Sequence, residues 1–363
     1  MKIASFEATT LNVPEDEPLA NMPEEKGRTR PVVILRLRTD NGIEGLGVTF
    51  YGGKVTGSLR VAVEELAAFT VGEDPMRIEA IIAKLRAAAD SAGPGGIFTL
   101  ALSAIDVALW DIKGKALDQP LWKLLGGHRD RVPTYASGAL RRGLTDDQAQ
   151  QAARTLVEKG FREMKTQMAL PGNPTPEDEM RRVRMVREAI GPDIKLMCDI
   201  NQRWRPEQAI DIGSRVEDVG LFWLEDVTTA DDYQGLARVT AALNTPIAGG
   251  EYLWGIAPFR QMIEARSVDI VMVDIARAGG VTPWMKIAGM AEAFNLPIVS
   301  HVMPEILVHV VAACPNGLTV EYMPRMLALY EETPPIENGE LVLSDKPGLG
   351  LKFDEKAIAA FTA

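Results

Sequence analysis

The arrangement of hydrophobic and polar positions changes character along the chain. Residues 3–10 alternate between apolar and polar, residues 32–38 are rich in β-branched side chains, and residues 40–42 (Asp-Asn-Gly) form a hairpin-type turn, so we expect the chain to begin with strands. From residue 59 to about residue 125 the apolar positions follow a helical period. Strands followed by helices predict a small α+β unit over roughly the first 125 residues.

A different pattern begins after His128. Short apolar runs alternate with longer amphipathic stretches, for example residues 146–159 and 176–190. This alternation predicts parallel βαβ units. Because each run is apolar enough to be buried on both sides, the pattern favours a closed (β/α) barrel over an open sheet. Only a short helix follows Pro304, and the tail from Pro334 returns to turns and short strands that we expect to pack against the N-terminal unit.

Most of the predicted barrel strands end in a polar residue. From Asp199 onward, successive strand ends are 20 to 27 residues apart, which is the length of one strand plus one helix, so the polar side chains should form a ring at the C-terminal mouth of the barrel. That mouth holds the active site in (β/α) barrels. In chain order from the second strand, these residues are Lys165 with Gln167, Asp199, Glu225, Glu251, Asp274, His301 and Glu321.

Three of these residues, Asp199, Glu225 and Glu251, are carboxylates on consecutive strands. They would repel one another at a few ångströms unless a cation neutralised them. Oxygen ligands with positions left for water and substrate favour magnesium over zinc. Taken alone, any one of them is better explained as a helix N-cap or an ion-pair partner. Their common register at the strand ends is what predicts a magnesium site.

The remaining strand-end residues suggest acid–base chemistry. Asp274 and His301 end neighbouring strands, where the carboxylate can orient the imidazole, so we predict that His301 is a general base. Lys165 cannot easily reach solvent from a buried strand and must meet an anion, either a substrate or a carboxylate. Glu321 is expected to be protonated or hydrogen-bonded near the metal, with a purely structural role as the alternative.

Composition narrows the class of protein. The sequence has 39 Lys and Arg residues against 50 Asp and Glu residues, so its net charge is −11 at pH 7, and it has no basic tail. Both features argue against nucleic-acid binding. Two cysteines, Cys198 and Cys314, cannot form a disulfide framework and fit a reducing cytoplasm. No signal peptide or spanning apolar stretch is evident, so no membrane partner is expected. His128 is predicted to lie at the surface and His309 to be structural.

Several segments resemble the enolase superfamily and, within it, the mandelate racemase/muconate lactonizing enzyme family. They are residues 104–115, 199–202, 223–226, 249–251, 273–280, 300–301 and 347–350. The resemblance covers the whole chain and implies an α/β fold, a modified (β/α)7β TIM barrel without its eighth regular helix, over residues 129–325. It also implies an α+β capping domain formed by residues 1–128 and completed by the tail, residues 326–363, and a homo-oligomeric assembly.

The resemblance also assigns roles to residues. It implies one Mg²⁺ on Asp199, Glu225 and Glu251 and a dyad of His301 and Asp274 as the base. It places Glu321 near the carboxylate of the substrate. The reaction that it implies begins with abstraction of the proton α to that carboxylate, so the expected partner is a small-molecule carboxylate.

One position departs from the family pattern. The Lys-x-Lys of the second strand is Lys165-Thr166-Gln167 here, so a glutamine stands where the family has a second base. An amide has no useful basicity at neutral pH, and two-base racemisation is therefore not supported. His301 alone can remove the α-proton and then protonate a departing β-hydroxyl, which is the dehydration of a sugar acid to a 2-keto-3-deoxy acid. Lys165 would neutralise the substrate carboxylate.

Substrate contacts are predicted for Gln167, Asn201 and Tyr51, and the polar segment of residues 14–31 suits a polyhydroxylated substrate better than an aryl one. Two alternatives to the dehydratase (lyase) remain. The first is an isomerase on the same scaffold, either a racemase or epimerase or a cycloisomerase of a carboxylate. The second is a non-catalytic, metal-stabilised binding protein, which would have no use for a basic dyad.

Overall fold

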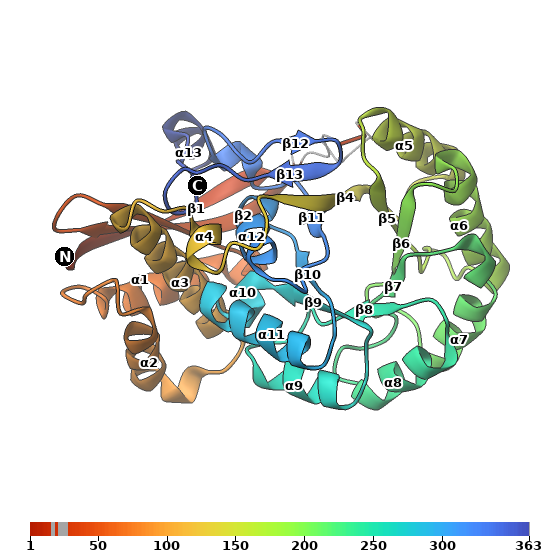
Figure 1. Cartoon of the computed structure of the whole chain (residues 1–363), viewed down its shortest axis with the longest axis horizontal. Coiled ribbons are helices and arrows are strands. Elements are labelled where there is room, and N and C mark those ends of the chain that lie inside the picture. Colours follow the sequence, from red (N-terminus) through yellow and green to blue (C-terminus); the bar gives the residue numbers. More distant parts are fainter. Residues whose placement is uncertain (16–18, 21–27, 363) are drawn as a thin grey trace.

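The computed structural model describes residues 1–15, 19–20 and 28–362. A three-stranded antiparallel sheet lies at one end of the molecule, and a curled parallel sheet surrounded by helices lies at the other (Figure 1). The antiparallel sheet consists of β1 (Ile3–Pro14), β2 (Thr29–Thr39) and β3 (Glu44–Thr49) in that order. Gly42 adopts φ +86° in the turn between β2 and β3, a conformation that favours glycine.

Helices cover one face of this sheet and complete the predicted α+β unit. Those on the sheet are α1 (Thr56–Ala68) and α3 (Gly96–Ala116), while α2 (Ile78–Ala88) and the short α4 (Leu121–Leu124) pack against α3. The fully buried face of α3 packs directly on β3. A Cβ atom at Gly47 would lie 2.1 Å from the backbone oxygen of Ala104, so only glycine allows the sheet and the helix to approach so closely.

The second part alternates strands and helices as the pattern predicts. Its strands are β4 (Arg131–Leu140), β5 (Glu163–Gln167), β6 (Lys195–Asp199), β7 (Trp223–Glu225), β8 (Ile247–Gly249), β9 (Ile270–Asp274), β10 (Ile298–His301) and β11 (Val320–Tyr322). Its helices are α5 (Asp146–Glu158), α6 (Pro176–Ile190), α7 (Pro206–Ser214), α8 (Tyr233–Ala242), α9 (Ala257–Glu264), α10 (Ile275–Ala278), α11 (Val281–Ala293) and α12 (Pro304–Ala313).

The parallel strands close on themselves. Strands β4 to β10 pair in sequence, and β11 pairs with β4. The backbone N–H of Leu318, just before β11, donates to the oxygen of Ile298 at 2.9 Å, which brings β10 against the eighth strand. Tyr135, Met197 and Trp223 belong to a separate buried cluster of inward-facing residues. The predicted α/β class, barrel and cap are therefore confirmed.

The register of the parallel strands places the predicted polar residues at the same height along the barrel axis. Gln167 pairs with Asp199, and Asp199 pairs with Glu225 on the next strand. Asp274 pairs with His301 in the same way. Because parallel strands present their carboxyl ends at one edge, this register gathers the side chains at the mouth of the barrel.

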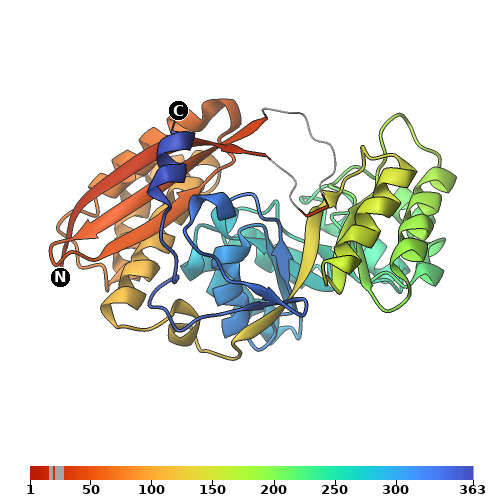
Figure 2. The same ribbon diagram turned by 90° about the horizontal axis from the view of Figure 1, so that it is seen from above.

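The C-terminal tail divides between the two parts. Strands β12 (Ile336–Glu337) and β13 (Glu340–Val342) form a hairpin whose second strand pairs with β4. Helix α13 (Glu355–Phe361) then crosses β1, where Thr362 bridges to Leu11 (Figure 2). Among the described residues, no helix combines the length and the apolar composition needed to cross a bilayer.

Glu305, in the first turn of α12, makes the stability of the protein depend on pH. Both carboxylate oxygens are buried without a hydrogen-bond partner, and burial raises the pKa of Glu305 to about 7 from an ordinary 4.5. Because the folded-state pKa is the higher one, the contribution of this group is fully present below about pH 4.5 and is lost as the pH rises through about 7. The loss should amount to about 2 to 3 kcal/mol between pH 5 and pH 8.

We expect Glu305→Gln to remove this pH dependence. Urea unfolding of both proteins at pH 5 and pH 8 should show the wild-type chain losing about 2 to 3 kcal/mol more than the variant over that interval. Glu264→Gln, at an exposed position on α9, serves as the matched control. Equal losses in the wild type and Glu305→Gln would contradict the assignment.

Candidate active site

The predicted strand-end residues surround one cavity of about 210 Å³ at the mouth of the barrel. Side chains from the barrel and from the capping part both line it. The predicted residues among its lining are Tyr51, Lys165, Gln167, Asp199, Asn201, Glu251, His301 and Glu321. Glu225 and Asp274 are fully buried beside it and contact Lys165 and His301, respectively.

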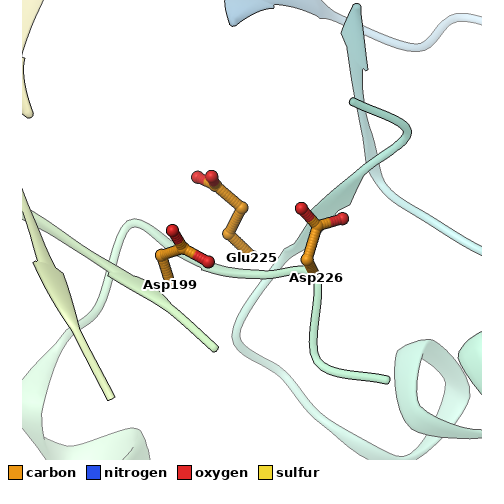
Figure 3. A group of neighbouring side chains, drawn as sticks. All are labelled: Asp199, Glu225 and Asp226. Atoms are coloured by element: carbon orange, nitrogen blue, oxygen red, sulfur yellow. The ribbon is translucent and has the colours of Figure 1, made fainter. Parts of the chain in front are cut away.

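Three carboxylates meet on one side of this cavity. Asp199, Glu225 and Asp226 each offer an oxygen within 4.8 Å of the others (Figure 3). Asp226 is not among the predicted ligands, although it directly follows Glu225 at the end of β7. The third predicted ligand, Glu251, lines the same cavity with its Oε2 atom 3.2 Å from Nε2 of His301. Its role as a ligand stays a prediction.

The electrostatics of this cluster call for a cation. Burial raises the pKa of Glu225 to about 8, with Asp199 and Glu321 adding to the rise and Lys165 opposing it. Burial likewise raises the pKa values of Asp226 and Glu251 well above their usual range, and neighbouring carboxylates add to both shifts. Oδ2 of Asp226 is buried with no hydrogen-bond partner. A buried donor set made only of carboxylate oxygens fits a hard divalent ion such as Mg²⁺.

Lys165 is the cation that the structure places among these acids. Its Nζ forms ion pairs with Glu225, with Glu321 at 2.9 Å and with Asp199 at 3.9 Å. Nζ also lies 5.5 Å from the ring centroid of Tyr135. Burial would lower the pKa of Lys165, but the carboxylates, Glu225 first, raise it well above its usual value. Carboxylates of the protein are therefore the anions that this lysine contacts.

His301 and Asp274 form the expected pair. Nδ1 of His301 lies 2.8 Å from Oδ2 of Asp274, which also accepts a 2.7 Å hydrogen bond from the hydroxyl of Tyr51. The other oxygen of Asp274 accepts the backbone N–H of Arg277 at 2.8 Å. Because the carboxylate needs a donor from the imidazole, Nδ1 carries the hydrogen and Nε2 faces the cavity as the basic atom. Burial opposes protonation of His301, but Glu251 and Glu321 outweigh it and raise its pKa.

Glu321 is held by the segment that follows His301. The backbone N–H of Val302 donates to Oε2 of Glu321 at 2.6 Å. Val302 adopts φ +50°, a conformation that costs a β-branched residue about 1 to 3 kcal/mol and that clusters at functional sites. Burial would raise the pKa of Glu321, but Lys165 and His301 lower it to about 2. Glu321 is therefore hydrogen-bonded, as one of the two expectations had it, and its role near the metal stays a prediction.

The three predicted substrate contacts already have partners within the protein. The Tyr51 hydroxyl bonds Asp274, as described, while its ring lines the cavity. Oε1 of Gln167 accepts the backbone N–H of Arg142 at 3.2 Å, and Oδ1 of Asn201 accepts the guanidinium of Arg142. Asn201 in turn donates to Asp199 through its backbone and side chain at 2.8 and 2.7 Å. Their contacts with a substrate stay predictions.

Sequence reasoning missed the arginines of this site. Arg142 lies just after β4, the first strand of the barrel, and only the ends of the later strands were used for prediction. Its place after a barrel strand would have identified it as a candidate. Arg277 donates to the backbone oxygen of Glu251 at 2.8 Å and stacks over the ring of Tyr51 at 4.1 Å. Arg30 and Arg325 line the cavity from β2 and from the loop after β11.

Other predicted residues lie outside the cavity. His309 is buried in α12, where Nε2 donates to the backbone oxygen of Leu349 at 3.1 Å and burial lowers its pKa to about 4, as a structural role requires. His128 is exposed. Cys198 is fully buried among residues that pack toward the helices rather than in the barrel interior. Most of the polar segment of residues 14–31 lies outside the described residues.

Comparison with known proteins identifies the family. Residues 6–126 match the model of the mandelate racemase/muconate lactonizing enzyme N-terminal domain, and residues 147–357 match the enolase C-terminal domain-like model. L-talarate/galactarate dehydratase of Salmonella typhimurium is 33% identical over 95% of this chain and 87% of its own. 3,6-Anhydro-alpha-L-galactonate cycloisomerase of Streptomyces coelicolor is 33% identical over 89% of each chain.

A solved structure extends the similarity to three dimensions. The crystal structure of L-talarate dehydratase from Polaromonas sp. JS666, complexed with Mg and L-glucarate, superposes with a TM-score of 0.90 at 31% identity and covers 100% of this chain and 97% of that one. Both the domain models and the relatives span nearly the whole sequence. The chain therefore belongs to the mandelate racemase/muconate lactonizing enzyme family of the enolase superfamily.

Proposed function

We propose that this chain is a Mg²⁺-dependent acid-sugar dehydratase. The observation that carries the proposal is the placement of His301, oriented by Asp274, on the same cavity as the carboxylate cluster, with Gln167 where a second base would stand. The dehydratase and the Mg-bound dehydratase structure among the relatives support it. One base on one side of the substrate suits elimination better than two-base racemisation.

Three carboxylates, Asp199, Glu225 and Glu251, would hold the metal, with Asp226 beside them. When bound, Mg²⁺ supplies stabilisation of the negative charge that develops on the substrate carboxylate. Lys165, kept charged by its ion pairs, adds positive charge at the same place. Gln167 and Asn201, fixed by Arg142, would hydrogen-bond substrate hydroxyls.

His301 then carries out two proton transfers. Nε2 of His301 takes the proton from C2, and the electron pair of the broken C–H bond forms a double bond to C3 as the C3–oxygen bond breaks. The imidazolium returns its proton to the departing hydroxyl, which leaves as water. The enol that remains takes a proton from solvent at C3 and releases the proton of its C2 hydroxyl to solvent, which gives the 2-keto-3-deoxy acid. Asp274 stabilises the imidazolium throughout and does not itself need to change protonation state.

The test is proton NMR of the protein with magnesium in deuterium oxide, run against hexonates, pentonates and diacid sugars. We expect one acid to be converted to a 2-keto-3-deoxy product that carries solvent deuterium at C3, with no reaction after EDTA treatment. Inversion or exchange at C2 without loss of water would contradict the proposal and would favour an epimerase. Absence of any reaction across the panel would also count against it.

A cycloisomerase is the second candidate, because one of the relatives is named as one. The same NMR experiment distinguishes it, since a cycloisomerase forms or opens a ring in an acid or lactone without releasing water. Addition of the matching lactones to the panel covers this case. Ring opening in place of dehydration would establish the second candidate.

The proposal extends to the setting of the enzyme. We infer a cytoplasmic protein with no nucleic-acid or membrane partner, supported by two buried free cysteines and a net charge of −11. Its homo-oligomeric assembly is inferred from the family to which it belongs. We also propose that residues 1–128 act as the capping domain and residues 129–325 as the catalytic domain, with residues 326–363 as the tail of the cap. Contact of α13 with β1 supports this division.

A further inference from the structure

Two arginines line the cavity without belonging to the machinery described above. Arg30 lies on β2 and Arg325 follows β11, so they approach from the capping part and from the barrel. Nη2 of Arg30 forms a 2.5 Å ion pair with Glu15, whereas its Nε is buried without a partner. Arg325 is half-buried, and within the described part of the chain its guanidinium has no hydrogen bond or ion pair.

The other cations of the cavity wall are already used. Lys165 is paired with Glu225 and Glu321. Arg277 donates to Glu251 and is stacked against two tyrosine rings. Arg325 therefore differs from its neighbours in offering a full set of donors to whatever enters the cavity. Arginine stays charged at any physiological pH, so this is a positive charge as well as a set of donors.

The chemistry of a guanidinium indicates the group it would take. A half-buried positive charge is costly unless an anion pairs with it, and a hydroxyl cannot neutralise it. The planar fork of donors matches a carboxylate in a bidentate geometry. The carboxylate next to the reacting carbon is already provided for by the metal ligands and Lys165, so Arg325 is free to bind a second one.

We propose that Arg325, assisted by Arg30, binds the distal carboxylate of the substrate, so that the enzyme selects diacid sugars over monoacid sugars of the same configuration. The inference rests on the proposed dehydration, because the proximal carboxylate is placed by that mechanism. A monoacid would present a hydroxymethyl group to Arg325 and leave its charge unpaired.

The test compares diacid and monoacid pairs, galactarate with galactonate and glucarate with gluconate, by kcat/KM. Loss of a charge-assisted, bidentate contact should reduce binding about 100-fold, so we expect the wild type to prefer the diacid by at least that factor. Arg325→Gln should lower kcat/KM about 100-fold for the diacid and change it less than about 3-fold for the monoacid. Arg260→Gln, on the exposed face of α9, is the matched control.

Two results would overturn the inference. Equal use of monoacids by the wild type would show that no distal carboxylate is selected. An equal loss for both acids in Arg325→Gln would show that Arg325 contacts a part common to both. Because Arg325 has no partner among the described residues, its replacement breaks no internal hydrogen bond and should leave the fold intact, which circular dichroism checks.

A binding measurement separates failure of this inference from failure of the proposed dehydration. Calorimetric titration of His301→Asn with galactarate and galactonate, in the presence of Mg²⁺, requires no turnover. A preference for the diacid that disappears in the His301→Asn, Arg325→Gln double variant supports the inference even if no acid is dehydrated. Dehydration of a sugar acid by the wild type without such a preference overturns the inference alone.

Discussion

His301→Asn is expected to lower kcat by about 10⁴-fold, because in the proposed mechanism one imidazole acts both as the base that takes the α-proton and as the acid that protonates the leaving hydroxyl. Asparagine keeps a polar group near Glu251, which lies 3.2 Å from Nε2 of the histidine, but it cannot accept and return a proton. The measurement is the rate of product formation in deuterium oxide, which should be lost.

Magnesium binding provides the control for this variant. His301 is not a proposed ligand, so the affinity of His301→Asn for Mg²⁺, measured by calorimetry, should stay within about 3-fold of the wild type. His128→Asn, at an exposed position, should leave both turnover and metal affinity unchanged. Retention of substantial product formation in His301→Asn would mean that another group removes the proton.

Glu225→Gln is expected to have the second large effect. The substitution removes a charged ligand from the carboxylate cluster and also the ion pair that holds Lys165. We expect Mg²⁺ affinity to fall at least about 100-fold and turnover at saturating substrate to fall at least about 10³-fold. Titration with MgCl₂ followed by calorimetry and by activity measures both quantities.

Comparison of neighbouring acids sharpens this prediction. Glu251→Gln should weaken Mg²⁺ binding as Glu225→Gln does, whereas Asp226→Asn should have a smaller effect if Asp226 only neighbours the ion. Glu264→Gln, on the surface of α9, controls for loss of one negative charge. If Mg²⁺ affinity were unchanged in Glu251→Gln and greatly reduced in Asp226→Asn, the third ligand would be Asp226, after β7, and not Glu251, after β8.

Regular structure made much of the site predictable. Parallel strands end at one edge, so Asp199, Glu225, Asp274 and His301 could be placed together from spacing alone. The amphipathic pattern was equally clear for some helices: α6 was predicted with its observed bounds, and the structure shows a capping box at Thr175 before it and Gly191 after it.

Irregular backbone and long-range docking account for what was missed. Asp226 follows β7 in irregular backbone with φ +46°, a conformation that strand periodicity does not predict. Arg30 and Arg325 line the same cavity although they are almost 300 positions apart in the sequence. Their proximity depends on how the cap packs against the barrel. No local pattern in the sequence carries that information.

The bond from Tyr51 to Asp274 has a consequence for recombination and protein engineering. Tyr51 lies in the cap, 223 positions earlier in the chain, and holds the carboxylate that orients His301, the proposed base. The Tyr51 ring packs under the guanidinium of Arg277 from the barrel. Replacement of the cap would therefore alter the His301–Asp274 pair as well as substrate specificity. A chimera that joins this barrel to a foreign cap would need a hydroxyl donor at the equivalent position, and cap libraries should keep Tyr51 constant while the surrounding loop is varied.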